Sequence, residues 1–353
     1  MGEKPHEYQA GFRTLGISSV DGSGGHSGES VSSLAVWYPS ARRGKVRYTV
    51  RMGEWFFEAE RNARPATGRF PVILLSHGMA GHNLANYDLA LALARRGFVV
   101  IAPSHYGDNS DNASAIFSAA LYYHRPRQLA TSLHKVADIP DLRAMMDLGR
   151  VGVLGSGSGA ITALQLAGAD LAPEAAPAFC AKKPANSMFC NDWAVARQAR
   201  LPAEAAELKA KFGPESFRPA PVGFRVGAVG LLTPGGLPLL EEKSLDAVQA
   251  PLGVVFSARD EFFPPPGDST GLSEILPPGL AARSTMYVCQ DVDHYSLAAP
   301  CPETVKTALP GLCGTAGRDE REDAALERDD FFISFFRLHL GLPVEIHAAP
   351  AGR

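Results

Sequence analysis

The last third of the chain carries an acid and a histidine at positions suited to acyl transfer. Asp260 comes just after the apolar run 252–257, and His294 comes just after the apolar run 285–289. Hydrolysis of an acyl compound needs a histidine as general base and a carboxylate that holds its tautomer and orientation. We therefore expect Asp260 to be hydrogen-bonded to His294. Glu261 is a competing acid but should face away, and Asp260 could alternatively cap the following turn.

A candidate oxyanion loop comes earlier in the chain. Residues 76–81 (SHGMAG) directly follow the apolar run 70–75. A His-Gly pair after such a strand lets the backbone N–H of Met79 point into a cleft, where it can stabilise a developing oxyanion. Considered alone, His77 would be interpreted as a buried structural histidine. Together with the acid and the histidine, the segment predicts an oxyanion hole with Met79 as a donor.

The nucleophile is the least regular part of the pattern. Residues 150–164 (RVGVLGSGSGAITAL) indicate a strand, a tight glycine turn and a helix, which together form the usual setting for a nucleophile. A G-x-S-x-G motif that starts at Gly155 places Gly157 where the serine is required. A phosphate-binding turn is an alternative, but no Walker lysine follows and the G-x-G-x-x-G pattern is incomplete.

Short apolar runs alternate with stretches of helical spacing along most of the chain. This alternation predicts an α/β fold, with a mostly parallel sheet covered by helices on both faces. The expected strands lie at residues 11–18, 31–38, 70–76, 98–102, 151–154, 226–232, 252–257 and 285–289. The expected helices lie at residues 83–96, 161–167 and 329–340, with a further helical stretch near 202–211.

One segment interrupts the alternation. Residues 170–221 are rich in Ala and Pro and are too long for a simple connection, so we expect an inserted cap or lid. A surface excursion without a role is the alternative. The core would then be one domain made of residues 1–169 and 222–345. Apolar side chains in the insertion point to a hydrophobic substrate, unless they only pack the lid down: Phe179, Met188, Phe189 and Trp193.

Composition excludes several classes of partner. Lys and Arg number 34 against 37 Asp and Glu, for a net charge of −3, so nothing predicts binding to nucleic acid or to an anionic membrane surface. The apolar runs are too short to span a bilayer. Residues 1–6 lack the apolar segment of a secretory signal. This is consistent with a cytoplasmic protein, or with a periplasmic or secreted one whose leader has been removed.

The five cysteines form two locally spaced pairs and one isolated residue. Cys180 and Cys190 are ten residues apart, and Cys301 and Cys313 are twelve apart, in irregular regions. We expect both pairs to form disulfides and Cys289, in an apolar strand, to remain a free thiol. Five free thiols are the alternative. No C-x-x-C spacing predicts a metal or redox site.

Together these segments resemble the dienelactone hydrolase-like and platelet-activating-factor acetylhydrolase-like branch of the α/β hydrolases. The resemblance extends roughly from Tyr8 to Leu340. It depends on residues 36–39 (VWYP), 75–78 (LSHG), 102–107 (APSHYG) and 260–265 (DEFFPP), and on His294 followed by 299–302 (APCP). It implies an α/β-hydrolase fold with a doubly wound sheet, hydrolysis of carboxylic esters by a Ser–His–Asp triad, and no cofactor. Many relatives are exported, which favours the disulfides.

The chain departs from this family at two positions. The family's Gly-His-Ser-x-Gly-Gly turn, aligned without a gap, falls on residues 155–160 and places the serine on Gly157. Asp293 stands where a glycine usually precedes the histidine. Its negative charge would favour the protonated imidazole, which cannot act as a base.

Three interpretations of the turn remain open. In the first, the turn has moved on by one residue and Ser158 is the nucleophile, with Ser156 as a small neighbour. In the second, the protein only binds a ligand, because a glycine tolerates the strained turn without supplying an oxygen. In the third, Asp260 and His294 activate water, as in a lyase or hydrolase without a covalent intermediate. We favour the first, a Ser158–His294–Asp260 esterase acting on a small hydrophobic ester.

Overall fold

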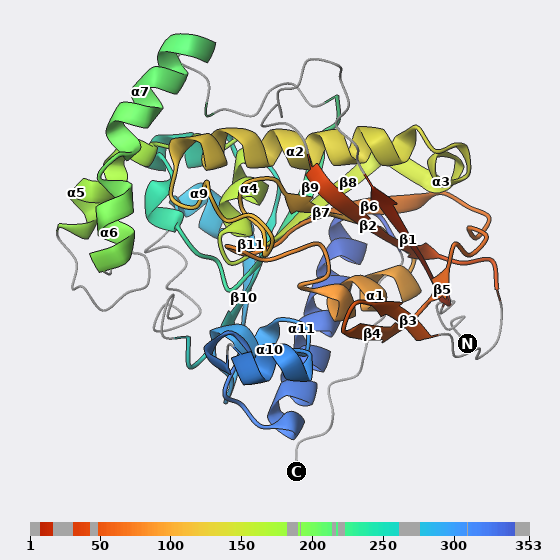
Figure 1. Cartoon of the computed structure of the whole chain (residues 1–353). Coiled ribbons are helices and arrows are strands. Elements are labelled where there is room, and N and C mark those ends of the chain that lie inside the picture. The colour runs from red at the N-terminus through yellow and green to blue at the C-terminus, as the bar shows by residue number, and fades with distance from the viewer. Residues whose placement is uncertain are drawn as a thin grey trace.

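A large central sheet organises the molecule. The computed structural model describes residues 8–16, 31–42, 49–181, 190, 192–213, 217, 223–260, 276–308 and 310–342. Within these ranges nine strands form one sheet in the order β11-β10-β9-β8-β6-β7-β2-β1-β5 (Figure 1). The strands are β1 (Ala10–Gly16), β2 (Val31–Pro39), β5 (Glu60–Arg61), β6 (Phe70–Ser76), β7 (Val99–His105), β8 (Met146–Ser156), β9 (Val226–Leu232), β10 (Leu252–Ser257) and β11 (Ser284–Cys289).

The strands that precede the candidate site residues all run in the same direction. From β11 to β7 every neighbouring pair is parallel, whereas β2 is antiparallel to both β7 and β1. The carboxyl ends of β6, β8, β10 and β11 therefore meet at one edge of the sheet. The expected mostly parallel, doubly wound sheet is confirmed.

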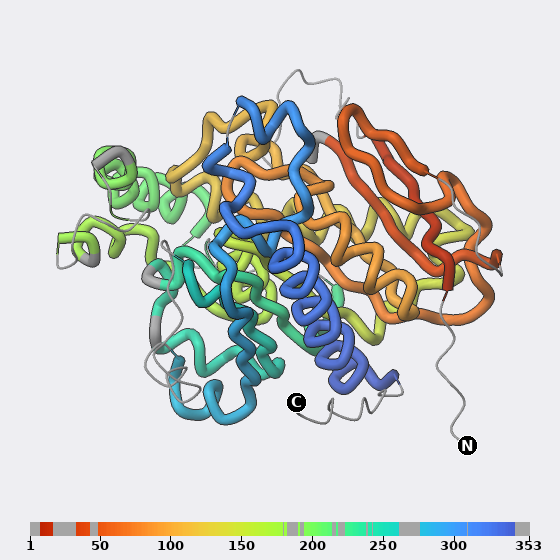
Figure 2. Tube along the Cα trace, turned by 90° about the horizontal axis from the view of Figure 1, so that it is seen from below, coloured from red at the N-terminus to blue at the C-terminus, as the bar shows by residue number. Residues whose placement is uncertain are grey.

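Helices cover both faces of this sheet because its central strands are apolar on both sides. In β6 every residue is buried, and its side chains alternate between two cores. Val72 and Leu74 pack with α2 (Ala119–Ala137) and α4 (Gly159–Leu166). Ile73 and Leu75 belong to the core formed with α1 (Tyr87–Arg95) and α11 (Arg318–His339). Figure 2 shows α1 and α11 side by side on this second face.

Two helices differ from the expectation. The helix expected over residues 329–340 begins eleven residues earlier, at Arg318. Asp319 and Glu320 in its first turn favour an early start, because acidic side chains stabilise a helix N-terminus. The 19-residue α2 was not expected at all. Pro126 and several buried polar residues interrupt its apolar spacing, so the sequence pattern hides it.

The described part of residues 170–221 forms a group of short helices at one end of the molecule (Figure 1). They are α5 (Ala176–Cys180), α6 (Asp192–Gln198) and α7 (Leu201–Phe212). α7 packs against α2, where Glu204 accepts a hydrogen bond of 2.9 Å from the backbone N–H of Ala119, and Phe212 stacks on Tyr123. The side chains of Phe179, Met188, Phe189 and Trp193, and the loop at residues 21–30, lie outside what the structure describes.

The remaining elements are short. A separate hairpin joins β3 (Thr49–Met52) to β4 (Trp55–Glu58), and further helices are α3 (Pro140–Met145), α9 (Pro278–Ala281) and α10 (Glu303–Ala308). None of the helices in the described ranges combines the length and apolar character that a membrane crossing requires.

Candidate active site

The structure brings the predicted acid and histidine together. Asp260 follows β10 and is 4% exposed, and His294 opens a 3-10 turn (His294–Leu297) after β11. His294 Nδ1 donates to Asp260 Oδ2 at 2.8 Å, and Ser257 Oγ contacts the same oxygen at 3.4 Å. Because a carboxylate only accepts, the proton of the neutral imidazole lies on Nδ1 and Nε2 is the basic nitrogen. Glu261 lies outside the described residues.

The sharp turn after β8 is centred on Gly157. Gly157 has φ +53°, whereas Ser158 has φ −64° and ψ −17° and already leads into α4. The expectation that the turn had moved on by one residue is therefore wrong. A Cβ at Gly155 would lie 2.2 Å from Gly159 O, and a Cβ at Gly159 would lie 2.2 Å from Ser76 O. These two close approaches identify residue 157 as the centre of the turn, because only glycine fits at positions 155 and 159.

The position of Gly157 faces both the histidine and the oxyanion loop. A Cβ added there would lie 3.9 Å from His294 Nε2 and 3.5 Å from the Cα of Gly78, so the site has room for a small side chain. The backbone N–H of Gly157 donates to Leu232 O at 2.9 Å, and Gly235 N–H donates to Gly157 O at 3.0 Å. The last residue of β9 and the segment that follows it thus hold the turn in place.

The hydroxyl of Ser158 is directed toward α2. Arg125 Nη1, from that helix, donates to Ser158 Oγ at 3.2 Å. Ser158 therefore has a hydrogen-bonded hydroxyl and a backbone N–H at the start of α4, one residue beyond the strained position.

The loop after β6 is held in place by hydrogen bonds of His77. His77 is buried, accepts from the backbone N–H of His105 at 3.1 Å and donates from Nδ1 to Gly78 O at 2.7 Å. Burial holds its pKa well below the usual value, with a further lowering from Arg125. His77 is thus a neutral structural histidine. It precedes Met79, and the next residue, Ala80, has φ +52°.

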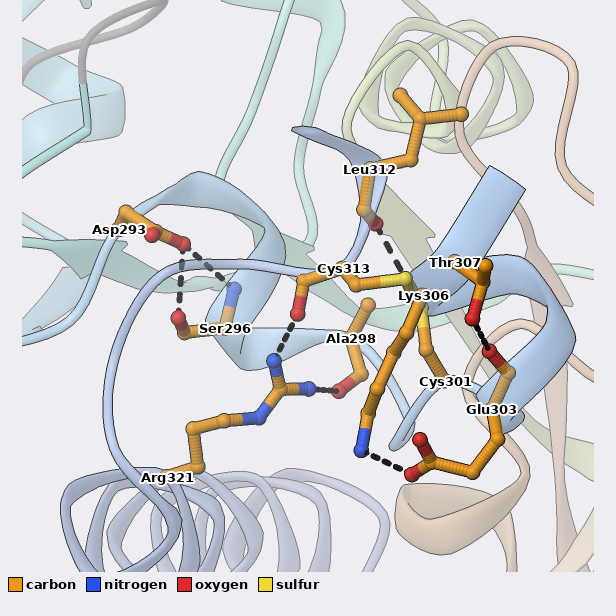
Figure 3. Close-up of a disulfide and its surroundings, with 10 residues drawn as sticks. All are labelled: Asp293, Ser296, Ala298, Cys301, Glu303, Lys306, Thr307, Leu312, Cys313 and Arg321. Carbon is orange, nitrogen blue, oxygen red and sulfur yellow. Dashed lines mark hydrogen bonds and ion pairs between the residues drawn. A yellow bond between two sulfur atoms is a disulfide. The ribbon is translucent and has the colours of Figure 1, made fainter. Parts of the chain in front are cut away.

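Asp293, the residue before His294, is hydrogen-bonded to Ser296 and to Thr315 in a neighbouring loop. Asp293 Oδ1 accepts from Ser296 N at 2.9 Å and from Ser296 Oγ at 2.7 Å (Figure 3). Its Oδ2 accepts from the backbone N–H and the hydroxyl of Thr315. Burial acts to raise the pKa of Asp293, but hydrogen bonds from Thr315 and Ser296 outweigh it and hold the pKa below its usual value. The carboxylate therefore anchors the turn that carries His294.

The second disulfide closes the same loop. Cys301 and Cys313 are bonded with their Cα atoms 5.6 Å apart, and Arg321 donates to Cys313 O and to Ala298 O (Figure 3). Cys180–Cys190 is also bonded, with Cα atoms 5.2 Å apart, and Cys289 is a buried free thiol. The cysteine prediction is confirmed.

Sequence reasoning missed a buried ion pair beneath the site. Arg125 and Asp108 are joined at 2.7 Å, with side chains 2% and 0% exposed. The available signal was an arginine preceded by His124 and two tyrosines and followed by Pro126. Among the described residues, no group of three or more His, Cys, Asp or Glu is placed to hold a metal ion.

A parallel sheet with a glycine turn after one strand, and an Asp–His pair after two others, defines the α/β-hydrolase fold. Residues 59–192 match the model of the dienelactone hydrolase family. The structure is similar to a ferulic acid esterase from Streptomyces cinnamoneus, with a TM-score of 0.56 and 17% identity, over 97% of this chain and 94% of that one. No curated protein matches the sequence. The chain therefore has the α/β-hydrolase fold and is dienelactone hydrolase-like over residues 59–192, and this family match supports an ester hydrolase.

Proposed function

We propose that the protein hydrolyses small hydrophobic carboxylic esters with Asp260 and His294 as its catalytic pair and with water in place of a seryl nucleophile. The observation that carries the proposal is the empty side-chain position of Gly157, 3.9 Å from His294 Nε2. A serine at this position would direct its hydroxyl group to the histidine. A water molecule is similar in size to that hydroxyl group and could take its place. The Asp–His hydrogen bond of 2.8 Å supports a base in the correct tautomer.

The reaction needs one attack and two proton transfers. His294 Nε2 accepts a proton from the water as the water oxygen bonds to the ester carbonyl carbon. The carbonyl electrons move to the oxygen, where the backbone N–H groups of Met79 and Ser158 stabilise the negative charge. The carbon–oxygen bond to the alcohol then breaks, and the imidazolium gives its proton to the leaving oxygen. The carboxylic acid and the alcohol are released, and no bond to the protein forms.

Two other interpretations compete with this proposal. Ser158 could form an acyl-enzyme, but its backbone lies outside the strained turn and its hydroxyl is bonded to Arg125. The protein could also bind a ligand without chemistry. Against this, the family match and the hydrogen-bonded Asp–His pair both favour a hydrolase.

Hydrolysis of a series of p-nitrophenyl esters from acetate to octanoate tests the proposal. We expect turnover by the native protein and a loss of about 10²–10⁴ in kcat for His294→Gln, because it removes the general base. His339→Gln is the control, since His339 lies at the exposed end of α11. Ser158→Ala keeps the backbone N–H and should therefore retain far more activity than His294→Gln. Abolished turnover in Ser158→Ala would instead identify a seryl nucleophile, and an inactive native protein would favour ligand binding.

A further inference from the structure

We infer that the buried Arg125–Asp108 ion pair positions the two N–H donors of the oxyanion hole. The inference rests on the proposed function, because it concerns the same site. Neither side chain contacts the reacting atoms in the proposed mechanism, so both are positioning residues. The pair joins α2 to the loop that follows β7. Arg125 contacts both the turn at residues 157–158, which we call the elbow, and the candidate oxyanion loop at residues 76–81.

The burial of this pair calls for an explanation other than stability. Removing two charges from water costs about as much as their attraction returns, and apolar side chains of similar size often stabilise a core equally well. What apolar side chains could not supply is the set of directed hydrogen bonds that the two groups make. Arg125 donates to four acceptors from three different segments of the chain.

The pair holds the oxyanion loop on both sides of Met79. Arg125 Nη2 donates to Ser76 Oγ at 2.9 Å and to the backbone carbonyl of His77. Asp108 Oδ1 accepts from the backbone N–H of Ala80 at 2.7 Å. Met79 lies between these two anchored residues, so the direction of its N–H follows from theirs. Ala80 keeps φ +52°, which is unfavourable for alanine, and the bond to Asp108 helps to hold it there.

The same guanidinium also reaches the elbow. Arg125 Nη1 bonds Asp108 Oδ2 at 2.7 Å and Ser158 Oγ at 3.2 Å. One rigid planar group therefore connects the segment of the first donor, Met79, to the residue that carries the second, Ser158. Asp108 compensates the positive charge, so the contribution to catalysis is one of geometry.

Arg125→Lys and Asp108→Asn test this role. Lysine keeps the charge but cannot span all four acceptors, and asparagine keeps an acceptor for Ala80 but breaks the ion pair. We expect kcat to fall about 10–100-fold in each variant with KM changed by less than about threefold, because a misplaced oxyanion donor affects the transition state more than the ground state. The affinity for a tetrahedral phosphonate monoester, measured by calorimetry, should fall in parallel with kcat/KM.

Arg150→Lys is the matched control. Arg150 also bonds an aspartate, Asp147, at 2.7 Å and the carbonyl of Arg69 at 3.1 Å, but at the other end of β8. The Arg150→Lys variant should lower the melting temperature, but it should not lower kcat at constant KM. Should Arg125→Lys fail to fold, Asp108→Asn and the milder Ser76→Ala carry the same comparison.

The results separate this inference from the proposed function. Phosphonate binding by the native protein with no ester turnover would reject the proposed function and leave the positioning role measurable. Unchanged phosphonate affinity in folded Arg125→Lys and Asp108→Asn would overturn the inference, even with turnover intact. A rise in KM at constant kcat would also overturn it, since that pattern indicates uniform substrate binding.

Discussion

The side-chain position of Gly157 lies next to His294, since a Cβ built on this glycine would lie 3.9 Å from the Nε2 of the histidine. The backbone has kept the strained turn, with φ +53°, that a nucleophile occupies in this fold. The strained turn and the hydrogen-bonded Asp260–His294 pair are present, and position 157 carries no side-chain oxygen.

Gly157→Ser should therefore create a reactive nucleophile. The nearest atoms to the new Cβ, at 3.5 Å and 3.9 Å, leave room for it, and its oxygen would come within reach of His294 Nε2. We expect this variant to react covalently with a fluorophosphonate, with one adduct mapped to position 157 by mass spectrometry. Gly53→Ser is the control, because Gly53 has φ +61° with open space around it and lies in the β3–β4 hairpin. Equal labelling of both variants, or of neither, would contradict the assigned geometry.

The two disulfides should differ in their effect on turnover. Replacing both cysteines of either pair by serine opens a loop of similar size and should lower the free energy of unfolding by about 2–3 kcal/mol. The Cys301–Cys313 loop is followed by Thr315, which donates to Asp293, the residue before His294. We expect kcat to fall several-fold without Cys301 and Cys313 and to be unchanged without Cys180 and Cys190. Equal values of kcat in the two double variants would reject this coupling.

The position of the acid–base pair could be predicted from the sequence. Which residue of the glycine turn occupies the strained position could not. Asp260 and His294 each follow a buried strand, and the ends of neighbouring parallel strands meet. The choice between Gly157 and Ser158 depended on a contact that the local pattern does not contain. Gly159 packs against the carbonyl of Ser76, 83 positions earlier in the chain, and only the folded backbone shows it.

The positioning pair escaped prediction for a related reason. Arg125 lies in a helix whose apolar spacing is weak, and Pro126 follows it directly. The partners that make the buried charge favourable come from the loop after β6, the loop after β7 and the start of α4. A sequence pattern registers the apolar face of a helix, but not a polar group whose acceptors lie in three distant segments.

Four histidines should make the fold less stable in mild acid. Burial lowers the pKa of His82 and His124 to about 4, and it lowers the pKa of His77 and His105 well below the usual value. The unfolded chain therefore binds more protons than the folded one once the pH falls below about 6.5, and folding weakens by up to about 1.4 kcal/mol per pH unit for each neutral histidine. Asp329, whose pKa burial raises to about 6, offsets one of them.

Urea unfolding at pH 7.5, 6.0 and 5.0 measures this effect. The free energy of unfolding should already fall between pH 7.5 and 6.0 and should fall more steeply between pH 6.0 and 5.0, because 6.0 lies below the usual histidine pKa of about 6.5. His124→Gln should reduce the dependence of the free energy of unfolding on pH, because it removes one of the four buried titrating groups. A free energy of unfolding that stays constant or rises toward pH 5 would contradict the assignment of neutral buried histidines.

Cys289 should be unreactive in the folded protein. Its side chain is fully buried in β11, its Sγ lies 3.8 Å from Ala324 O, and burial raises its pKa to about 12. We expect no reaction with a thiol-specific disulfide reagent under native conditions and one thiol per chain in denaturant without reductant. Five thiols in denaturant would exclude both disulfides, and one reactive thiol in the native protein would contradict the burial.

The most direct test of the central claim is the intact mass of the native protein after exposure to excess fluorophosphonate, measured together with its ester hydrolysis. Hydrolysis by water at an Asp260–His294 pair forms no bond to the chain. We therefore expect an unmodified mass and undiminished turnover of the ester. A stoichiometric adduct at Ser158, with loss of activity in proportion to labelling, would contradict the account and establish a seryl nucleophile one residue beyond the elbow.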